Sequence, residues 1–339
     1  MNTLLPKQFR SLTDVALIKK LEAGLEQVES GLLNATKHTD PVAKDAARHL
    51  VEAGGKRIRP VLVMLAAQLG NPDVKEVIDS AVVVELTHLA TLYHDDVMDE
   101  APTRRGVPTA QMIWGNNLAI LTGDLLFARA SQVGSRLGEE SLILQADTFE
   151  RLCLGQLHET IGPNETEDPI AHYIQVMADK TGSLIAAAAR LGIMLSGAPR
   201  EYLEPMGAYG EKVGVAFQLI DDVIDISEAG PSGKTPGTDL RAGVPTMPVL
   251  LLRKAAAAGD KSAADLLTLI DGDLTAIDFG DVCLNYDKQW FAKNELKAPE
   301  SLADLTKPDY ADLTVLTNPA SSSPGLAFLA AAVDVFGDA

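Results

Sequence analysis

Residues 80–100 read SAVVVELTHLATLYHDDVMDE, and this stretch decides the fold class. Its spacing predicts a helix with apolar residues on more than one face, and such a helix is stable only when other helices surround it. A second stretch of the same character, EKVGVAFQLIDDVIDIS, covers residues 211–227. Together they predict an all-α protein, a large helical bundle with these two helices among its central members.

The rest of the chain agrees with this prediction. Hydrophobic residues make up 46% of the 339 residues and aromatic residues only 5%, so the apolar content is mostly aliphatic, which favours packed helices over a sheet. Ser11 and Asp14 form a candidate capping pair before a first helix. Further helical stretches lie at 60–70, 116–137, 141–161, 170–197 and 201–227. We expect one domain over 1–339, although residues 271–339 differ in character and carry four prolines at positions 299, 308, 319 and 324.

Net charge, cysteine content and the apolar segments indicate which binding partners and which cellular compartment to expect. The chain has 29 Lys and Arg against 47 Asp and Glu, a net charge of −18, which argues against a nucleic-acid partner. Two cysteines, Cys153 and Cys283, cannot form a disulfide framework, and we expect free thiols in a reducing compartment. The amino-terminal residues do not resemble a signal peptide, and no apolar run reaches about 18 residues. These features predict a cytoplasmic protein without a membrane anchor.

Both central helices carry the same acidic pattern, DDVMD at 95–99 and DDVID at 221–225. At about 100° per residue, the three aspartates of each pattern lie on one side of the helix. We name them the first aspartate cluster (Asp95, Asp96 and Asp99) and the second aspartate cluster (Asp221, Asp222 and Asp225). Carboxylates within apolar helices are costly unless a cation is present. Oxygen ligands without His or Cys suit Mg²⁺, with Mn²⁺ as a substitute, bound to a phosphate ester. The alternative is that each acidic pattern is only a solvated polar face. The occurrence of the same pattern in two apolar helices argues against this alternative.

Basic residues lie beside these clusters in sequence. Residues 54–60 read GGKRIRP, a compact basic turn before a helix that suits anion binding. Arg104 and Arg105 follow the first aspartate cluster, and Lys180 and Lys234 lie in the second half. A single Arg or Lys is more often a solvated surface charge. In a chain of net charge −18, however, their joint placement favours a phosphate site.

His88 precedes Asp95 by seven residues, which places both on one stripe of the helix, about 20° apart. A lone histidine in an apolar helix is usually a hydrogen-bonded core residue. The shared stripe favours a functional role instead.

These residues resemble the trans-isoprenyl diphosphate synthases, or polyprenyl synthetases. The similarity rests on GGKRIRP, LYHDDVMDEAPTRRG, DKTGSLIAAAARLG and VGVAFQLIDDVIDI followed by GKTPGTDLRAGVPTMP, and it is strongest over residues 54–252. The resemblance implies an isoprenoid-synthase fold around a deep central cavity, usually as a homodimer. It also implies that an allylic diphosphate condenses with isopentenyl diphosphate.

The resemblance assigns roles by motif position. Both aspartate clusters would hold Mg²⁺ ions that bridge the allylic diphosphate. Three cations would contact that diphosphate, namely Arg104, Lys180 and Lys234. Four residues would hold isopentenyl diphosphate, namely Lys56, Arg59, His88 and Arg105. Thr181 and Gln218 would line the reacting centre.

Ala90 and Thr91 bear on product length. Short-product members of the family carry bulky aromatic residues at these positions, whereas both residues here are small. The resemblance therefore implies an all-trans product longer than C20, such as a quinone side-chain precursor, whose release could involve transient membrane contact. The alternative is that both are ordinary helix-packing residues.

Two departures and three other functions remain open. Thr238 stands where a second lysine often follows GKxxG, and the chain ends AAAVDVFGDA without the basic residues common in the family. The alternatives are a shorter-chain geranylgeranyl-type synthase, a non-catalytic subunit of a two-component synthase, and a class I terpene cyclase. A cyclase needs no second diphosphate site, so Lys56, Arg59 and Arg105 argue against it.

Overall fold

The computed structural model describes residues 12–226 and 243–277, together with Leu5, Pro6, Phe9, Gly237 and Leu240. The chain separates into two compact units. The first unit comprises Met1–Asp239 and Val244–Leu251, and the second comprises Leu240–Gly243 and Leu252–Ala339. Every predicted site residue belongs to the first unit, although Lys234 lies outside the described residues.

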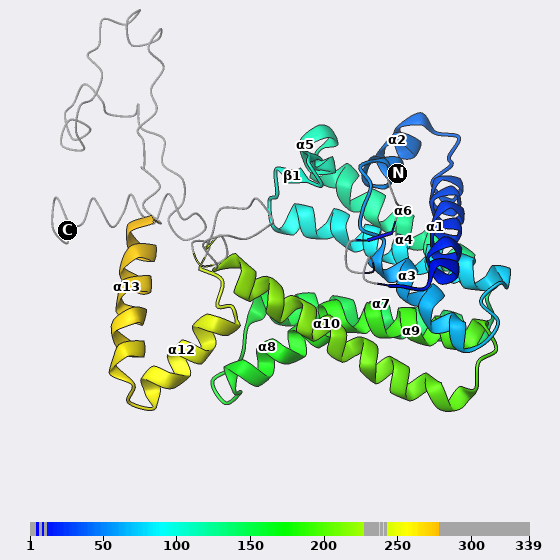
Figure 1. Ribbon diagram of the computed structural model, residues 1–339. Helices are drawn as coiled ribbons and strands as arrows, with labels where there is room; N and C mark the ends of the chain where they lie inside the picture. Colours follow the sequence, from blue (N-terminus) through cyan, green and yellow to red (C-terminus); the bar gives the residue numbers. More distant parts are fainter. Residues whose placement is uncertain are drawn as a thin grey trace, which may run out of the picture. The chain divides into compact units, whose positions relative to one another are not determined.

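Helices account for almost all regular structure in the described part of the chain (Figure 1). The first unit contains α1 (Val15–Ala35), α2 (Pro41–Glu52), α3 (Ile58–Ala66), η2 (Ala67–Leu69), α4 (Lys75–Met98), β1 (Thr103–Arg104), β2 (Val107–Pro108), α5 (Ala110–Trp114), α6 (Asn116–Gly134), α7 (Glu139–Ile161), α8 (Pro169–Met177), η3 (Ala178–Gly182), α9 (Ser183–Leu195), η4 (Arg200–Tyr202) and α10 (Leu203–Asp225). Helix α12 (Met247–Ala257) crosses the boundary between the units, and α13 (Lys261–Ile277) belongs to the second.

Aspartate side chains cap the starts of three helices. Asp14 accepts hydrogen bonds from the backbone nitrogens of Ala16 and Leu17 at 2.9 and 3.1 Å, which confirms its predicted capping role. Asp40 and Asp168 cap α2 and α8 in the same way, and each is followed by a proline at the first helical position. Local sequence thus fixes where these helices begin.

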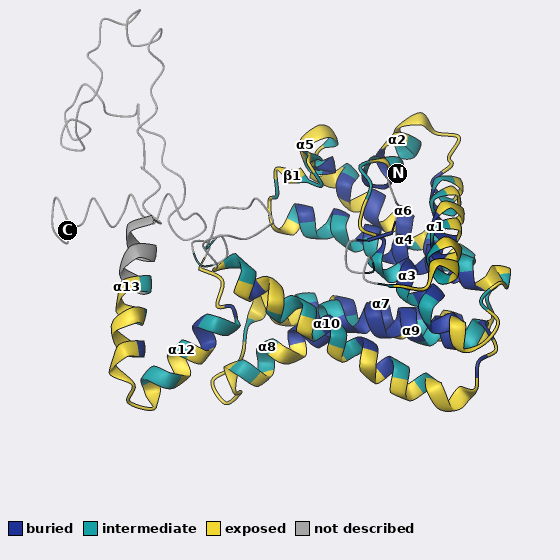
Figure 2. Cartoon of the chain, in the orientation of Figure 1, coloured by how far each residue is buried: buried dark blue, intermediate teal, exposed yellow. Residues whose placement is uncertain are grey.

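Helices α4 and α9 form the centre of the first unit, as the sequence predicted for residues 80–100. Helix α4 packs against α1, α3, α6 and α9, and α9 packs against α3, α7 and α10. Both helices are buried on nearly every face, whereas the outer face of α10 is largely exposed (Figure 2). The prediction that residues 211–227 form a second central helix is therefore wrong, because α10 packs on one side only and exposes apolar residues such as Ile220 and Val223 on the other. The all-α prediction is confirmed.

Two local features differ from the sequence-based expectation. The turn-rich segment after the first aspartate cluster contains a two-stranded antiparallel pair in which Arg104 faces Val107. Strands of two residues are too short for a periodic pattern to indicate them. The expected helix over 170–197 is interrupted by the π-helical turn η3, which separates α8 from α9. Across the described residues, none of the helices combines the length and apolar character needed to cross a bilayer.

Candidate active site

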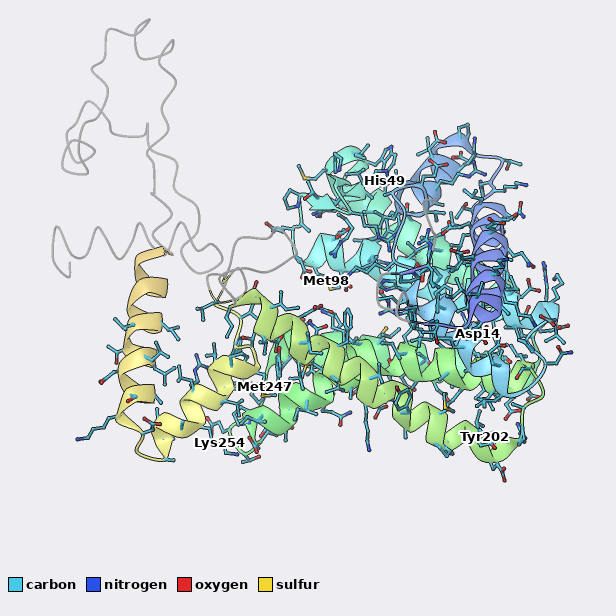
Figure 3. The ribbon with its side chains drawn as sticks, in the orientation of Figure 1. Asp14, His49, Met98, Tyr202, Met247 and Lys254 are labelled. Atoms are coloured by element: carbon cyan, nitrogen blue, oxygen red, sulfur yellow. The ribbon has the colours of Figure 1, made fainter. Side chains whose placement is uncertain are left out.

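The two aspartate clusters lie at the carboxyl ends of α4 and α10, and both ends lie on the same side of the first unit in Figure 1. Met98, the last residue of α4, marks that end in Figure 3. Helical spacing places Asp95 and Asp96 on α4 and makes Asp99 its C-cap. Asp221, Asp222 and Asp225 occupy the last turns of α10.

Asp96 is buried in the first aspartate cluster, and Arg104 is its ion-pair partner. The Nε and Nη2 atoms of Arg104 both lie 2.7 Å from Asp96 Oδ1. Asp96 Oδ2 is buried and accepts no hydrogen bond within the described structure. Burial raises the pKa of Asp96, and the hydrogen bond from Arg104 lowers it only in part. Burial also raises the pKa of Asp95, against the opposing positive charge of Lys180.

Asp222 is the buried member of the second aspartate cluster. Its Oδ2 atom accepts hydrogen bonds from the Tyr173 hydroxyl at 2.8 Å and from the Met247 backbone nitrogen at 3.2 Å. Burial raises the pKa of Asp222 despite these two hydrogen bonds. Asp221 is exposed and Asp225 is half-buried. Like Asp96, Asp222 is thus a buried carboxylate whose charge is incompletely compensated by the protein.

The donor chemistry of both clusters suits a hard divalent cation, because all donors are carboxylate oxygens. The unpartnered Oδ2 atom of Asp96 fits the same chemistry. Within the described residues, however, no three acidic, histidine or cysteine side chains converge closely enough to hold an ion. Arg104 and Tyr173 occupy oxygens of Asp96 and Asp222 instead.

Four arginines lie around His88, and we call Arg57, Arg59, Arg104 and Arg105 the arginine cluster. Arg57 is fixed by carboxylates: its Nε lies 2.6 Å from Glu29 Oε1 and its Nη1 lies 2.8 Å from Glu85 Oε1. Burial tends to lower the pKa of Arg57, but these carboxylates raise it on balance. Arg57 adopts a left-handed conformation with φ of 50°, which turns the chain into α3.

The remaining arginines have fewer protein partners. Arg105 donates to the carbonyl of Leu50 at 2.8 Å and also to that of Gly54. The Nε atom of Arg59 is buried and has no hydrogen-bond partner in the described part of the chain. A Cβ atom at Gly55 would lie 2.8 Å from Arg57 Nη1 and 3.0 Å from Arg105 Cζ, so glycine allows the loop to wrap these guanidinium groups. Lys56 is exposed on the same loop.

His88 lies against the arginine cluster. Its pKa is held well below the ordinary value, first by burial and then by the positive charges of Arg59, Arg105, Arg104 and Arg57. The imidazole is therefore neutral at pH 7, with a donor and an acceptor nitrogen. The structure brings together Arg59, Arg105 and His88, which the sequence grouped as holders of one diphosphate.

Lys180 and Thr181 both lie in the π-helical turn η3. The Lys180 ammonium forms an ion pair with Glu159 on α7, and its charge also acts on Asp95. The predicted contact of Lys180 with the allylic diphosphate stays a prediction. Gln218 lies on α10, half-buried, three residues before Asp221.

The predicted chain-length residues occupy different environments. Ala90 is fully buried, and its carbonyl packs against Gly123 of α6. Thr91 is half-buried on the stripe that also carries His88 and Asp95, and its hydroxyl donates to the His88 carbonyl at 2.9 Å. Tyr93 points into the core and donates to the Ala46 carbonyl at 2.6 Å. Of these three residues, only Thr91 lies on the stripe of the predicted site.

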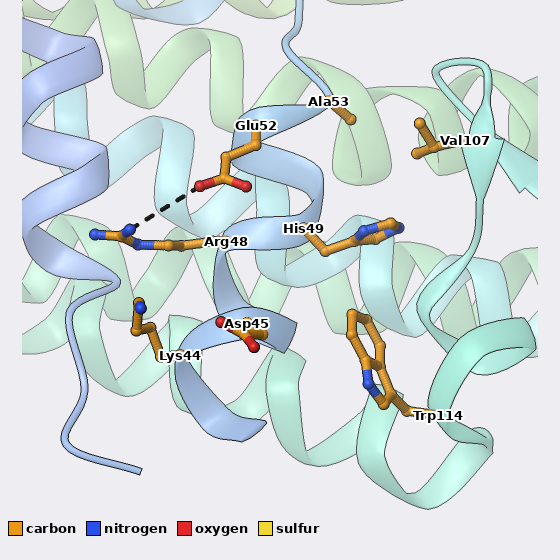
Figure 4. A pocket seen from close by; sticks show the side chains of 8 residues that line it. All are labelled: Lys44, Asp45, Arg48, His49, Glu52, Ala53, Val107 and Trp114. Atoms are coloured by element: carbon orange, nitrogen blue, oxygen red, sulfur yellow. Dashed lines mark ion pairs between the residues drawn. The ribbon is translucent and has the colours of Figure 1, made fainter. Parts of the chain in front are cut away.

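A cavity of about 530 Å³ lies beside α2 and α5, and its lining includes Ala53 and Val107 but none of the predicted site residues (Figure 4). The rings of His49 and Trp114, which both line it, pack edge to face with their centroids 5.3 Å apart. The charged residues that line it are two basic and two acidic, namely Lys44, Arg48, Asp45 and Glu52. Because these charges balance, the cavity lacks the net positive charge that a diphosphate requires.

Sequence reasoning missed the partners of the predicted residues. Glu85 lies on α4, one turn before His88, and pairs with Arg57 at the start of α3. Tyr173 and Glu159 come from other helices and reach Asp222 and Lys180 only through tertiary packing. No local pattern indicates such contacts.

An all-α unit with paired aspartate clusters beside arginines defines a class of enzyme, one that handles diphosphate esters with metal ions. The polyprenyl synthetase family model matches residues 40–273. The chain belongs to the polyprenyl synthetase family, and the predicted identification as a prenyltransferase of this family is confirmed.

Relatives and solved structures agree with this assignment. A nonaprenyl diphosphate synthase from Mycobacterium tuberculosis is 50% identical over 241 residues, covering 70% of this chain and 72% of that protein. A decaprenyl diphosphate synthase structure from Rhodobacter capsulatus has 32% identity and a TM-score of 0.67, covering 77% of this chain and 83% of that one. A geranylgeranyl pyrophosphate synthase structure from Corynebacterium glutamicum, complexed with calcium and isoprenyl diphosphate, has 41% identity and a TM-score of 0.67, covering 79% and 87%.

A second family model, described as a bacterial extracellular solute-binding protein, matches residues 252–339. The two matches overlap at residues 252–273. The boundary between the compact units also falls at Leu251 and Leu252. The expectation of one synthase domain over 1–339 stays a prediction, and these two findings favour a different division.

Proposed function

We propose that this chain condenses an allylic diphosphate with isopentenyl diphosphate, head to tail, to give an all-trans polyprenyl diphosphate longer than C20. One observation carries the proposal: Arg59 of α3 and Arg105 of the β1–β2 turn lie close to His88 of α4. The buried carboxylate of Asp96 lies further along the same helix. This arrangement offers one region for a diphosphate anion and another for a metal cation. The long-chain product is supported by the nonaprenyl and decaprenyl diphosphate synthase relatives.

Different residues bind the two diphosphate groups of the substrates. In this proposal Arg59, Arg105, Lys56 and the neutral His88 bind the diphosphate of isopentenyl diphosphate, and Arg104, Lys180 and Lys234 bind the allylic diphosphate. Fixed cations stabilise the negative charge that grows on the leaving diphosphate. The apolar faces of the surrounding helices exclude water from the allylic cation. Thr181 and Gln218 line the reacting centre.

Mg²⁺ is the proposed ion, and both aspartate clusters are its proposed ligands. The ion would neutralise diphosphate charge when bound, as oxygen-bound divalent cations do. Asp96 would hold the ion through its Oδ2 atom, which has no hydrogen-bond partner within the described residues, while Arg104 stays on Oδ1. Asp222 would be the corresponding buried ligand in the second aspartate cluster.

Turnover of labelled isopentenyl diphosphate, with several allylic primers and Mg²⁺, tests this function. Products longer than C20 by mass support the proposal, and a geranylgeranyl product supports the shorter-chain alternative. Cyclic products would indicate a terpene cyclase. The absence of turnover until another protein is added would indicate a subunit of a two-component synthase.

Product length gives a residue-level test at Thr91 and Ala90. We expect Thr91→Phe to shorten the product by one or more C5 units, because Thr91 lies on the stripe with His88 and Asp95. We expect Ala90→Phe to overpack the α4–α6 contact, at a cost of about 1–3 kcal/mol of unfolding free energy. Mass spectrometry of products and thermal unfolding check these outcomes. An unchanged product profile for Thr91→Phe would remove Thr91 from the length determinant.

A homodimer is the proposed assembly. Aliphatic side chains on α6 and α7 are exposed in the described structure, among them Leu121 at 61%, Ile143 at 53% and Leu157 at 50%. Extended exposed apolar surface is typical of an interface, and most homo-oligomers are symmetric dimers. Light scattering of the chain and of Ile143→Glu tests this assembly. A monomeric wild-type chain would contradict it.

We further propose that residues 274–339, which follow the polyprenyl synthetase match, are a part separate from the synthase, of the solute-binding type that the second family model describes. The second match supports this view. A chain ending at Asp273 should keep prenyl transfer if the segment is separate, whereas loss of turnover with intact folding would assign residues 274–339 to the synthase. The expected cytoplasmic location and transient membrane contact stay predictions, which fractionation and turnover with added vesicles can test.

A further inference from the structure

The π-helical turn η3 places Lys180 and Thr181 and therefore needs support from its surroundings. Such turns are rare, interrupt the regular helical hydrogen bonds and occur frequently at functional sites. Here the Ser183 hydroxyl donates to the Asp179 carbonyl at 2.5 Å, which satisfies one backbone acceptor of the turn. The side chain of Asp179 provides a second support.

The Asp179 carboxylate is buried and uses both of its oxygens. Oδ1 accepts hydrogen bonds from the Nε and Nη2 atoms of Arg151, both at 2.7 Å. Oδ2 accepts from Gln175 Nε2 at 2.8 Å. Asp179 directly precedes Lys180, so these contacts fix the backbone of η3 at the residue before the predicted ligand.

Arg151 extends this contact to a third element. Its Nη1 atom lies 2.6 Å from Glu211 Oε2 on α10. One guanidinium on α7 thus joins η3 to the helix that carries the second aspartate cluster. The guanidinium is planar and its donors are fixed relative to one another, so it sets the direction of both carboxylates.

Backbone packing brings the same three elements together. A Cβ atom at Gly155 of α7 would lie 2.7 Å from the Lys180 backbone nitrogen. A Cβ atom at Gly182 would lie 2.9 Å from the Glu211 carbonyl, and one at Gly214 would lie 2.6 Å from the Gly182 Cα. The turn η3 is therefore held between α7 and α10 at backbone distance.

We propose that Arg151 is a positioning residue: through Asp179 and Glu211 it sets Lys180 and Thr181 in place relative to the second aspartate cluster. The inference rests on the proposed function, because the proposed function assigns Lys180 and the second aspartate cluster to the allylic diphosphate. Helix α7, which carries Arg151, packs mainly against η3, α9, α8 and α6, whereas the proposed holders of isopentenyl diphosphate lie in the loop before α3, on α3, on α4 and in the β1–β2 turn. Loss of Arg151 should therefore slow turnover and leave isopentenyl diphosphate affinity nearly unchanged.

The test compares Arg151→Met with Arg190→Met in the full chain. Arg190 provides a matched control, because its Nη2 atom lies 2.8 Å from Glu204 and also links a central helix, α9, to α10. We expect kcat to fall about 10- to 100-fold in Arg151→Met, the size that displacement of a catalytic group by about 1 Å can cause. KM for isopentenyl diphosphate should stay within about twofold, because its cradle is untouched. Arg190→Met should keep kcat while lowering Tm.

Equal kcat in the two variants would overturn the proposal. If Arg151→Met does not fold, Glu211→Met removes the acceptor on α10 and leaves the Asp179 contacts, and a wild-type kcat in that variant would also overturn the proposal. Arg151→Lys should remain impaired, because lysine keeps the charge and lacks the planar fork. A wild-type chain without turnover refutes the proposed function, whereas an active wild type with unaffected variants refutes only the positioning role.

Discussion

The arginine cluster and the aspartate clusters lie in the same unit but differ in how far the protein itself completes them. Arg57 is neutralised by Glu29 and Glu85, and Arg105 is held by backbone carbonyls. Asp96 and Asp222 are buried with raised pKa values, and within the described residues Asp96 Oδ2 has no hydrogen-bond partner. Most cations of the arginine cluster are paired by protein groups, with the Nε atom of Arg59 as the exception, whereas in the aspartate clusters burial outweighs the compensation of both buried carboxylates.

The largest effect should come from Asp222→Asn. The amide oxygen can still accept the hydrogen bonds from Tyr173 and Met247, but the negative charge that attracts a metal ion is lost. We expect turnover to fall about 10³-fold, since one electrostatic contact in a transition state can have this size. We also expect metal-free Tm to be equal or higher, because an incompletely compensated buried charge is removed. Steady-state kinetics and calorimetry check both outcomes, with exposed Asp265→Asn as a control. A large loss of Tm would contradict the contrast between the regions.

A smaller effect is expected from Arg59→Met. The buried Nε atom of Arg59 awaits an acceptor, and a charged hydrogen bond is worth about 1.5–3 kcal/mol. KM for isopentenyl diphosphate should therefore rise about 10- to 100-fold with a modest change in kcat. Lys44→Gln, in the cavity by α2, is the control. An equal loss of affinity for the allylic primer would mean that the two diphosphates share this residue.

The smallest effect is a pH dependence of stability that arises from His88. The pKa of His88 is lowered in the folded chain, so its contribution is present above the ordinary value of about 6.5 and is lost as pH falls below it. We expect Tm to fall as the pH decreases below about 6.5, and His88→Gln to flatten that part of the curve. Calorimetry across this range measures the difference between the two chains. Parallel curves would show that other groups dominate.

The sequence was sufficient to predict the central helix and the positions of the site residues along it, because both depend on helical periodicity. The all-round apolar pattern at 80–100 predicted a central helix, and the spacing of His88 and Asp95 predicted a shared stripe. Arg59 and Arg105 were grouped through the family resemblance, and folding brings both to His88.

The contacts that complete each region could not be predicted in the same way. The Tyr173 bond to Asp222 and the Arg151 bonds to Asp179 and Glu211 join different helices, so their residues have no fixed spacing along the chain. The π-helical turn was hidden because its residues, ADKTG, continue the helical pattern of their neighbours. Lys234 lies outside the described residues, so its predicted contact with the allylic diphosphate stays a prediction.

Helix α4 carries both His88 and Asp95 on one stripe, without a break between them. The seven-residue separation therefore corresponds to about 10 Å along the axis, given a rise of about 1.5 Å per residue. The spacing of the two proposed binding regions is therefore set by one continuous helix and not by loops. Inserting or deleting one residue at 89–94 would rotate one region against the other by about 100°, whereas a substitution there would keep their spacing.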